Sequence, residues 1–74
     1  MSANQVLRDL RGRRVIVVTL RGTYSGILEL VDGHMNIVLR DAALLDDSSR
    51  QAVAKVGTVV VRGSAVVSIE AEEK

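Results

Sequence analysis

The chain has 74 residues, with ten Lys and Arg against nine Asp and Glu, no Cys, and Tyr24 as its single aromatic residue. A chain of this length forms one domain, residues 1–74, and buries only about 60% of the surface that its unfolded form exposes, so its core alone is marginal. Without Cys, oligomerisation remains as a further source of stability. A net charge of +1 excludes a polybasic arm that binds any polyanion.

Composition excludes several other classes of protein. The longest apolar runs, residues 15–20 and 56–61, are too short to cross a bilayer, and no signal peptide is recognisable. One His and scattered carboxylates match no nucleophile–base pair and no metal-ligand spacing. We therefore expect a cytoplasmic protein that is not an enzyme, carries no metal or cofactor, and makes no membrane contact.

The chain begins with a helical pattern and continues with extended ones. Val6, Leu7 and Leu10 fall on one face at helical spacing, and Gly12 is a typical helix stop, so a helix is predicted over residues 4–11. Runs rich in β-branched residues then predict five strands joined by short turns. These strands span about residues 14–20, 24–31, 36–45, 54–62 and 65–70.

The predicted fold is mainly β, with a short N-terminal helix before a strongly bent, five-stranded antiparallel sheet that forms a small open barrel. Gly26 lies inside the second predicted strand, where a glycine usually marks a bulge or sharp bend. The last two strands are apolar and contain no Pro, so their unpaired edges favour strand addition by a neighbouring copy. If each copy offers one edge and accepts another, the contact is head-to-tail, and closure gives a ring.

Polar side chains that suit a nucleobase gather in the turn after the second predicted strand. His34, the only His, has an imidazole that can stack on a base, and the carboxamide of Asn36 offers both donors and acceptors to a base edge. A carboxylate at Asp32 is more useful for fixing Asn36 or backbone amides than for facing a phosphate. Taken alone, the Asp32-Gly33 pair is an ordinary turn signal in which Gly33 supplies a positive φ.

A second turn adds a guanidinium. Arg62-Gly63 follows the fourth predicted strand, and an Arg plane stacks on pyrimidines at roughly 1–3 kcal/mol per base. Alone this dipeptide is weak evidence, because Arg11-Gly12 and Arg21-Gly22 repeat it. The combination of the two turns, rather than either one, indicates a site for single-stranded RNA.

With these residues in order, the chain resembles the Sm-like (LSm) family, and in particular its archaeal members. The resemblance extends from the helix to the fifth strand and rests on two motifs. The first comprises Val15 to Leu20, Gly22, Gly26, Leu28, Asp32, His34, Met35, Asn36 and Leu39, and the second comprises Val59, Val60, Val61, Arg62, Gly63, Val66 and Ile69.

The resemblance implies a ring, usually of seven copies, in which the fourth strand of one subunit pairs with the fifth of the next and uridine-rich single-stranded RNA binds in the pore. His34 and Arg62 would sandwich the base and Asn36 would bond the uracil edge. The remaining site residues, by the same resemblance, are Asp32, which orients its neighbours, Gly63, whose backbone lies close to the base, and Ser64, which stands where relatives commonly have Asp or Asn.

Alternatives stay open at this point. A ring of six or eight copies differs from seven by only a few degrees of rotation, and other Sm-like chains or RNA-processing proteins are further candidate partners. A structural or adaptor ring would act mainly through protein contacts. The bacterial RNA chaperone Hfq is a related alternative, but its second motif carries Tyr-Lys-His where this chain has Val61-Arg62-Gly63. The archaeal type, with a role in RNA metabolism or processing, is therefore favoured.

Overall fold

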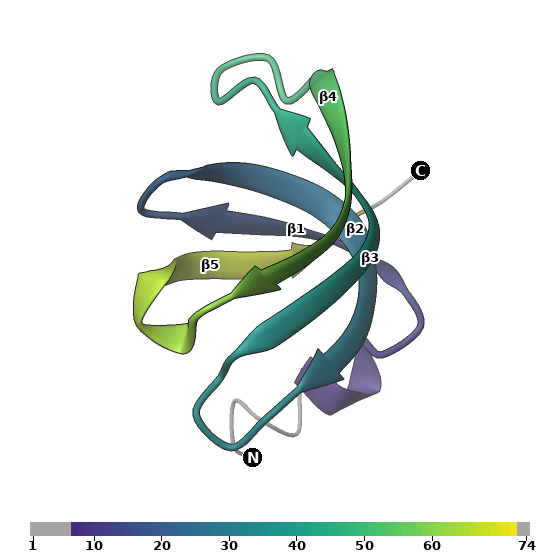
Figure 1. Cartoon of the computed structure of the whole chain (residues 1–74), viewed down its shortest axis with the longest axis vertical. Coiled ribbons are helices and arrows are strands. Elements are labelled where there is room, and N and C mark those ends of the chain that lie inside the picture. Colours follow the sequence, from purple (N-terminus) through teal and green to yellow (C-terminus); the bar gives the residue numbers. More distant parts are fainter. Residues whose placement is uncertain (1–6, 73–74) are drawn as a thin grey trace.

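The computed structural model describes residues 7–72 of the chain. Five strands follow one another, with a single 3-10 turn before the last (Figure 1). Their bounds are β1 Arg14–Thr19, β2 Gly22–Val31, β3 Ile37–Leu45, β4 Ala52–Val61, η1 Gly63–Ala65 and β5 Val66–Ala71. The mainly β fold with five strands is confirmed, and the strand ends lie within two residues of those expected. The largest differences are at the starts of β2 and β4, which pair with β1 and β3 earlier than the sequence indicated.

A short helix precedes the sheet. Residues 7–9 are helical, whereas residues 4–6 of the predicted helix lie outside the described residues. Residues 10–12 form a turn, so the helix ends earlier than expected. Gly12 has a φ of 82° and donates its N–H to the carbonyl of Leu28 at 2.8 Å, which ends the helix and ties it to β2. Within residues 7–72, no helix has the length and apolar character that a bilayer crossing requires.

The strands form one antiparallel sheet in the order β4-β3-β2-β1-β5. This order leaves β4 and β5 at the two edges, as the sequence predicted. The sheet curls strongly, so that residues from both edges reach the same core (Figure 1). Val61 of β4 belongs to the buried cluster against which Val66 and Ile69 of β5 pack.

The core is built almost entirely of aliphatic side chains. Its most deeply buried members alternate along the strands, because every second residue of a strand points to the same face. Val15, Val17, Leu28, Ile37 and Leu39 are fully buried. Burying each such side chain contributes about 1.5–3 kcal/mol relative to leaving it exposed. Leu28 near the end of β2 and Ile37 at the start of β3 anchor the two strands on either side of the turn that joins them.

Gly26 is where β2 bends. The pairing register between β2 and β3 shifts between Ser25 and Ile27, so Gly26 lies at an irregularity of the kind that its sequence position predicted. Gly26 is buried, and a Cβ there would lie 3.1 Å from the Cβ atoms of both Leu39 and Ala42. A larger residue would push β2 and β3 apart at the bend.

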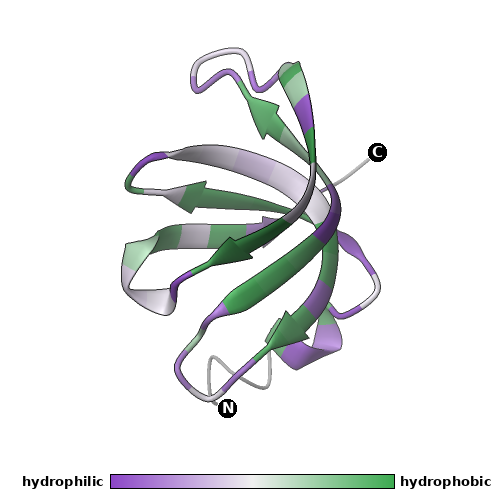
Figure 2. Ribbon diagram, viewed as in Figure 1, coloured by the Kyte–Doolittle hydropathy of each residue, from purple (hydrophilic) through white to green (hydrophobic). Residues whose placement is uncertain are grey.

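The two edge strands expose apolar side chains. Val53 and Val60 of β4 are 60% and 67% exposed, and Val67 of β5 is 61% exposed. Figure 2 shows hydrophobic residues along much of β4, the strand that crosses the front of the molecule. Edges with free backbone groups and apolar side chains are suited to strand addition.

Candidate nucleic-acid interface

The turn between β2 and β3 is held by the carboxylate of Asp32. Its Oδ1 accepts hydrogen bonds from the backbone N–H groups of His34 and Asn36 at 2.8 and 2.9 Å, and its Oδ2 accepts one from the side-chain Nδ2 of Asn36 at 2.9 Å. The backbone closes the same turn, because the N–H of Asp32 donates to the carbonyl of Asn36 and that of Met35 donates to the carbonyl of Asp32. Asp32 therefore orients the turn, as the residue pattern suggested.

These bonds also set the charge of the turn. The hydrogen bond from the Asn36 side chain, followed by that from the Asn36 backbone N–H, lowers the pKa of Asp32 below its ordinary value. Partial desolvation raises this pKa, and the backbone N–H and the nearby ring of His34 lower it by smaller amounts, so the net direction stays downward. Asp32 is consequently a stable anion at neutral pH, and it keeps accepting from Asn36.

The strained residue in this turn is not the one that the sequence indicated. Met35 has a φ of 65°, whereas Gly33 does not adopt a positive φ, so the expectation that Gly33 supplies it was wrong. The reason is the three bonds to Asp32, which fix the chain on both sides of Met35 and leave the reversal to this residue. A left-handed conformation costs an ordinary residue about 1–2 kcal/mol, so the surrounding bonds must maintain it.

A side-chain hydrogen bond joins this turn to the one after β4. Ile37 of β3 pairs with Val61 of β4, which brings the two turns side by side, both toward the lower left of Figure 1. Asn36 Oδ1 then accepts a hydrogen bond from the backbone N–H of Gly63 at 2.8 Å. Only one orientation of the carboxamide gives an N–H to Asp32 and an oxygen to Gly63, so its direction is fixed.

Gly63 fits this contact because it has no side chain. A Cβ at this position would overlap the carbonyl oxygen of His34 and would lie 3.0 Å from the Cβ of Met35. The backbone after Arg62 then turns through η1, where the N–H of Ala65 donates to the carbonyl of Arg62 at 2.9 Å. The turn expected between the fourth and fifth predicted strands is thus a single 3-10 turn.

The structure brings most of the predicted site residues together. Asp32, Asn36 and Arg62 line one surface hollow of about 420 Å³. His34 is exposed on the same turn, and Gly63 is bonded to Asn36. Ser64 is placed differently, because it lines a neighbouring hollow of about 490 Å³ that Arg62 shares with Tyr24 and Thr19.

The apolar part of the 420 Å³ hollow was not among the predicted site residues. Leu30, Val31, Val38 and Val60 complete its lining, and Leu30 and Val60 are both cross-strand neighbours of Val38. Leu30, Val38 and Val60 lie on the face of the sheet opposite the core, whereas Val31 pairs with the buried Ile37 and packs against the core. All four lie near strand ends, next to the polar turns. Consecutive apolar residues at Leu30-Val31 and Val59-Val60-Val61, more than one face of a strand requires, were the available signal.

The family model described as the LSM domain matches residues 5–71. The chain belongs to the LSM family. The predicted resemblance is therefore confirmed, and each of the two motifs defined above includes one of the two turns.

Individual LSM proteins are similar to this chain over nearly its whole length. The U6 snRNA-associated Sm-like protein LSm6 of Coprinopsis cinerea is 34% identical over 73 residues, covering 97% of this chain and 75% of that protein. The Sm protein of Pyrococcus abyssii, solved in complex with a uridine heptamer, is 27% identical with a TM-score of 0.85, covering 97% of this chain and 100% of the other. The SmAP1 heptamer of Pyrobaculum aerophilum is 33% identical with a TM-score of 0.86, covering 100% and 97%.

Proposed function

We propose that this chain forms a homo-oligomeric ring, of seven copies, that binds uridine-rich single-stranded RNA at its pore and acts in RNA metabolism or processing. The observation that carries the proposal is the hydrogen-bond chain from Asp32 through Asn36 to the backbone of Gly63. It fixes a carboxamide between two turns, one carrying His34 and the other Arg62. The role of this chain is then binding rather than catalysis.

The fixed carboxamide retains the capacity to read a base. Asn36 has two N–H donors and two acceptor lone pairs, and its bonds to Asp32 and Gly63 use one of each. One donor and one acceptor remain, and uracil presents an acceptor carbonyl directly beside an N–H donor. The exposed imidazole of His34 and the exposed guanidinium of Arg62 supply planar groups for stacking.

The relatives support both parts of the proposal. The Pyrococcus abyssii protein was solved with a uridine heptamer, and the Pyrobaculum aerophilum protein is a heptamer. In this chain, the two edges β4 and β5 suit addition of the β5 strand of one copy to the β4 strand of the next. Each pocket alone is weak, but a ring presents one per copy to successive nucleotides and so gains avidity.

The test measures binding of labelled oligouridine, oligocytidine and an RNA duplex to the intact protein, by fluorescence anisotropy at one fixed salt concentration. We expect oligouridine to bind best. We expect Arg62→Ala to weaken that binding about tenfold or more, since stacking contributes roughly 1–3 kcal/mol per base. Arg13→Ala is the matched control, because it removes the same charge from an exposed residue outside both turns.

Native mass spectrometry of the same samples establishes whether the variants keep the assembly. Equal, weak and salt-screened binding to all three nucleic acids would refute the uridine pocket. If the ring forms but binds no RNA, an adaptor ring that works through protein contacts is the better description. Hfq-like RNA chaperone activity would instead appear as accelerated annealing of two complementary strands.

A further inference from the structure

One row of cross-strand neighbours runs across the whole sheet and ends in opposite charges. From one edge to the other, Lys55 of β4 pairs with Ala43, Ala43 with Ser25, Ser25 with Ile16, and Ile16 with Glu70 of β5. Directly opposed residues in a sheet point to the same face. Lys55 and Glu70 therefore lie on the same face, at the two free edges.

These two residues are also the only charged ones in their strands. β4 reads AVAKVGTVVV and β5 reads VVSIEA, so one edge carries a single cation and the other a single anion. Lys55 is in the first half of β4, and Glu70 is in the last half of β5. Antiparallel addition of β5 from one copy to β4 of another places these two halves next to each other.

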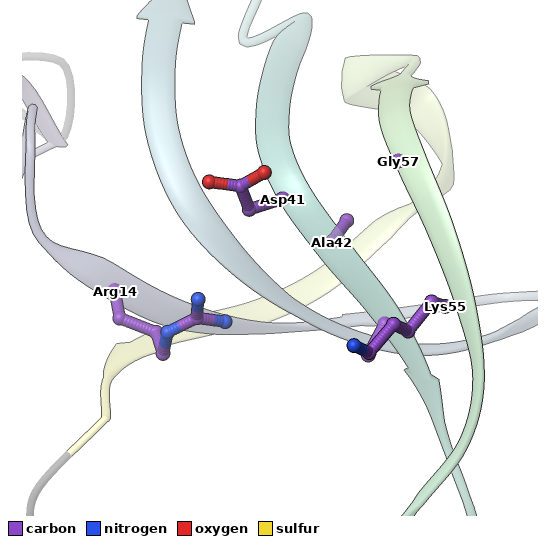
Figure 3. Close-up of a pocket in the computed structure, with 6 residues that line it drawn as sticks. Arg14, Asp41, Ala42, Lys55 and Gly57 are labelled. Carbon is purple, nitrogen blue, oxygen red and sulfur yellow. The ribbon is translucent and has the colours of Figure 1, made fainter.

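Lys55 has no anionic partner among residues 7–72. The ion pairs in this part of the chain join Arg40 to Glu29 and Asp41, and Arg50 to Glu70. Lys55 instead shares a hollow of about 410 Å³ with Arg14 and Asp41. Figure 3 shows the side chains of Lys55 and Arg14 pointing toward one another across the sheet, which brings two cations onto the same face.

Glu70 can accept a second cation. Its Oε1 accepts a hydrogen bond from Arg50 at 2.6 Å, and the side chains of both residues remain about half exposed. A carboxylate offers about four lone-pair positions, so one bond to Arg50 leaves room for an ammonium group from another molecule.

We infer that Lys55 of one copy pairs with Glu70 of the next copy and that this ion pair sets the register in which β4 and β5 join. The inference rests on the proposed ring and names the contact that aligns it. A slip of one residue would move Lys55 and Glu70 to opposite faces. An approaching Glu70 would draw the Lys55 ammonium away from Arg14.

Carbodiimide crosslinking of the unmodified protein tests the contact directly, because this reagent joins an amine and a carboxylate that already touch. Equal amounts of ¹⁵N-labelled and unlabelled protein are mixed, crosslinked and digested, and the peptides are identified by mass spectrometry. We expect a Lys55–Glu70 crosslink that combines labelled and unlabelled peptides. Lys55 joined only to other carboxylates in a sample that is fully assembled would overturn the inference.

Charge reversal gives an independent test. Lys55→Glu and Glu70→Lys each place like charges at the contact, so each should lower the urea concentration at which the ring dissociates. The double variant should recover part of the loss of Glu70→Lys, but not the part that comes from losing the pair with Arg50. Arg13→Glu, outside both edge strands, is the control and should leave this midpoint unchanged. Circular dichroism confirms that each variant is folded. A double variant no more stable than the weaker single variant contradicts the ion pair.

The two proposals fail in different ways. A wild-type protein that stays monomeric at micromolar concentration refutes the ring itself. A wild-type ring whose dissociation midpoint is the same in both single variants refutes only the Lys55–Glu70 register.

Discussion

Substitution of Gly63 disturbs the contact between the two turns most directly. In Gly63→Ala, the new Cβ would overlap the carbonyl oxygen of His34 and lie 3.0 Å from the Cβ of Met35. Carbon atoms prefer a separation of roughly 3.5–4.0 Å, so the Met35 contact alone would move the turns apart by about 0.5–1 Å, and the overlap with the His34 oxygen requires a larger shift. The Gly63 N–H···Oδ1 bond to Asn36, now 2.8 Å, would then exceed the usual range of about 2.7–3.2 Å.

The expected loss follows from these two effects together. Losing a partly buried hydrogen bond costs about 0.5–1.5 kcal/mol, and crowding of this kind costs about 1–3 kcal/mol, so the free energy of unfolding should fall by roughly 1.5–4.5 kcal/mol. Arg62 moves with Gly63, so its guanidinium shifts relative to His34. We expect oligouridine affinity to fall at least about tenfold, in keeping with the stacking energy at stake.

Urea denaturation followed by circular dichroism measures the stability, and fluorescence anisotropy measures the affinity. Gly33→Ala is the matched control, because a Cβ at Gly33 meets no atom within 4 Å and the residue lies in the same interface. The control should match the wild-type protein in both measurements. If Gly63→Ala also keeps wild-type stability and affinity, the tight contact between the turns does not matter and the reasoning fails.

Two further predictions concern the turn itself. Met35→Val should lower the free energy of unfolding by about 1–2 kcal/mol, because a β-branched residue resists the left-handed φ of 65°. Met35→Asn should lower it less, because asparagine tolerates that conformation. Equal losses for the two variants would contradict this explanation. The pKa of Asp32 is lowered by folding, so its ionised form stabilises the protein above the ordinary value of about 3.9 and this contribution is lost as pH falls through the lower folded pKa. We therefore compare the free energy of unfolding of the wild-type protein and Asp32→Asn by urea denaturation from pH 7 to pH 3. The difference in favour of the wild-type protein should be constant near neutral pH and shrink below about pH 4. A difference that is unchanged at pH 3 would contradict the lowered pKa of Asp32.

The sequence predicted the sheet well because its signals are local. Runs of β-branched residues mark the strands, and Gly26 marks the bend, where the β2–β3 register does shift. The ends of the strands were predicted less accurately, because hydrogen-bonded pairing with a neighbouring strand, rather than the intrinsic preference of each residue, decides where a strand begins and ends. β2 begins at Gly22 because Gly22 and Thr23 pair with residues of β1, although they resemble turn residues in the sequence.

The sequence indicated which side chains lie at the two turns but not how they are connected. Residue types alone indicated Asp32, His34, Asn36 and Arg62. The bond from the Gly63 N–H to Asn36 crosses 27 positions of sequence, and only the pairing of β3 with β4 brings the two together. The local sequence likewise did not indicate that Met35, rather than Gly33, has the positive φ in the first turn. Long-range contacts and the hydrogen bonds to Asp32 override the intrinsic preference of glycine for that conformation.

The edge strands were also only partly predictable from the sequence. Sequence pattern indicated that the last two strands are apolar edges, but the relation between Lys55 and Glu70 depends on the register of four strand pairs. A row of residues that starts with a cation and ends with an anion suits head-to-tail repetition, because each copy presents the complement of what it accepts. Assembly and RNA binding would thus use neighbouring parts of the same sheet, its edges and its turns, and Val60 belongs to both.

Native mass spectrometry of the protein with a seven-nucleotide oligouridine tests most directly whether the pocket is repeated around a ring. We expect the mass of seven copies with one bound strand, and the same seven copies without RNA for Arg62→Ala under identical conditions. A monomer, or a ring that retains oligouridine after Arg62→Ala as well as before, would contradict a pore lined by this pocket.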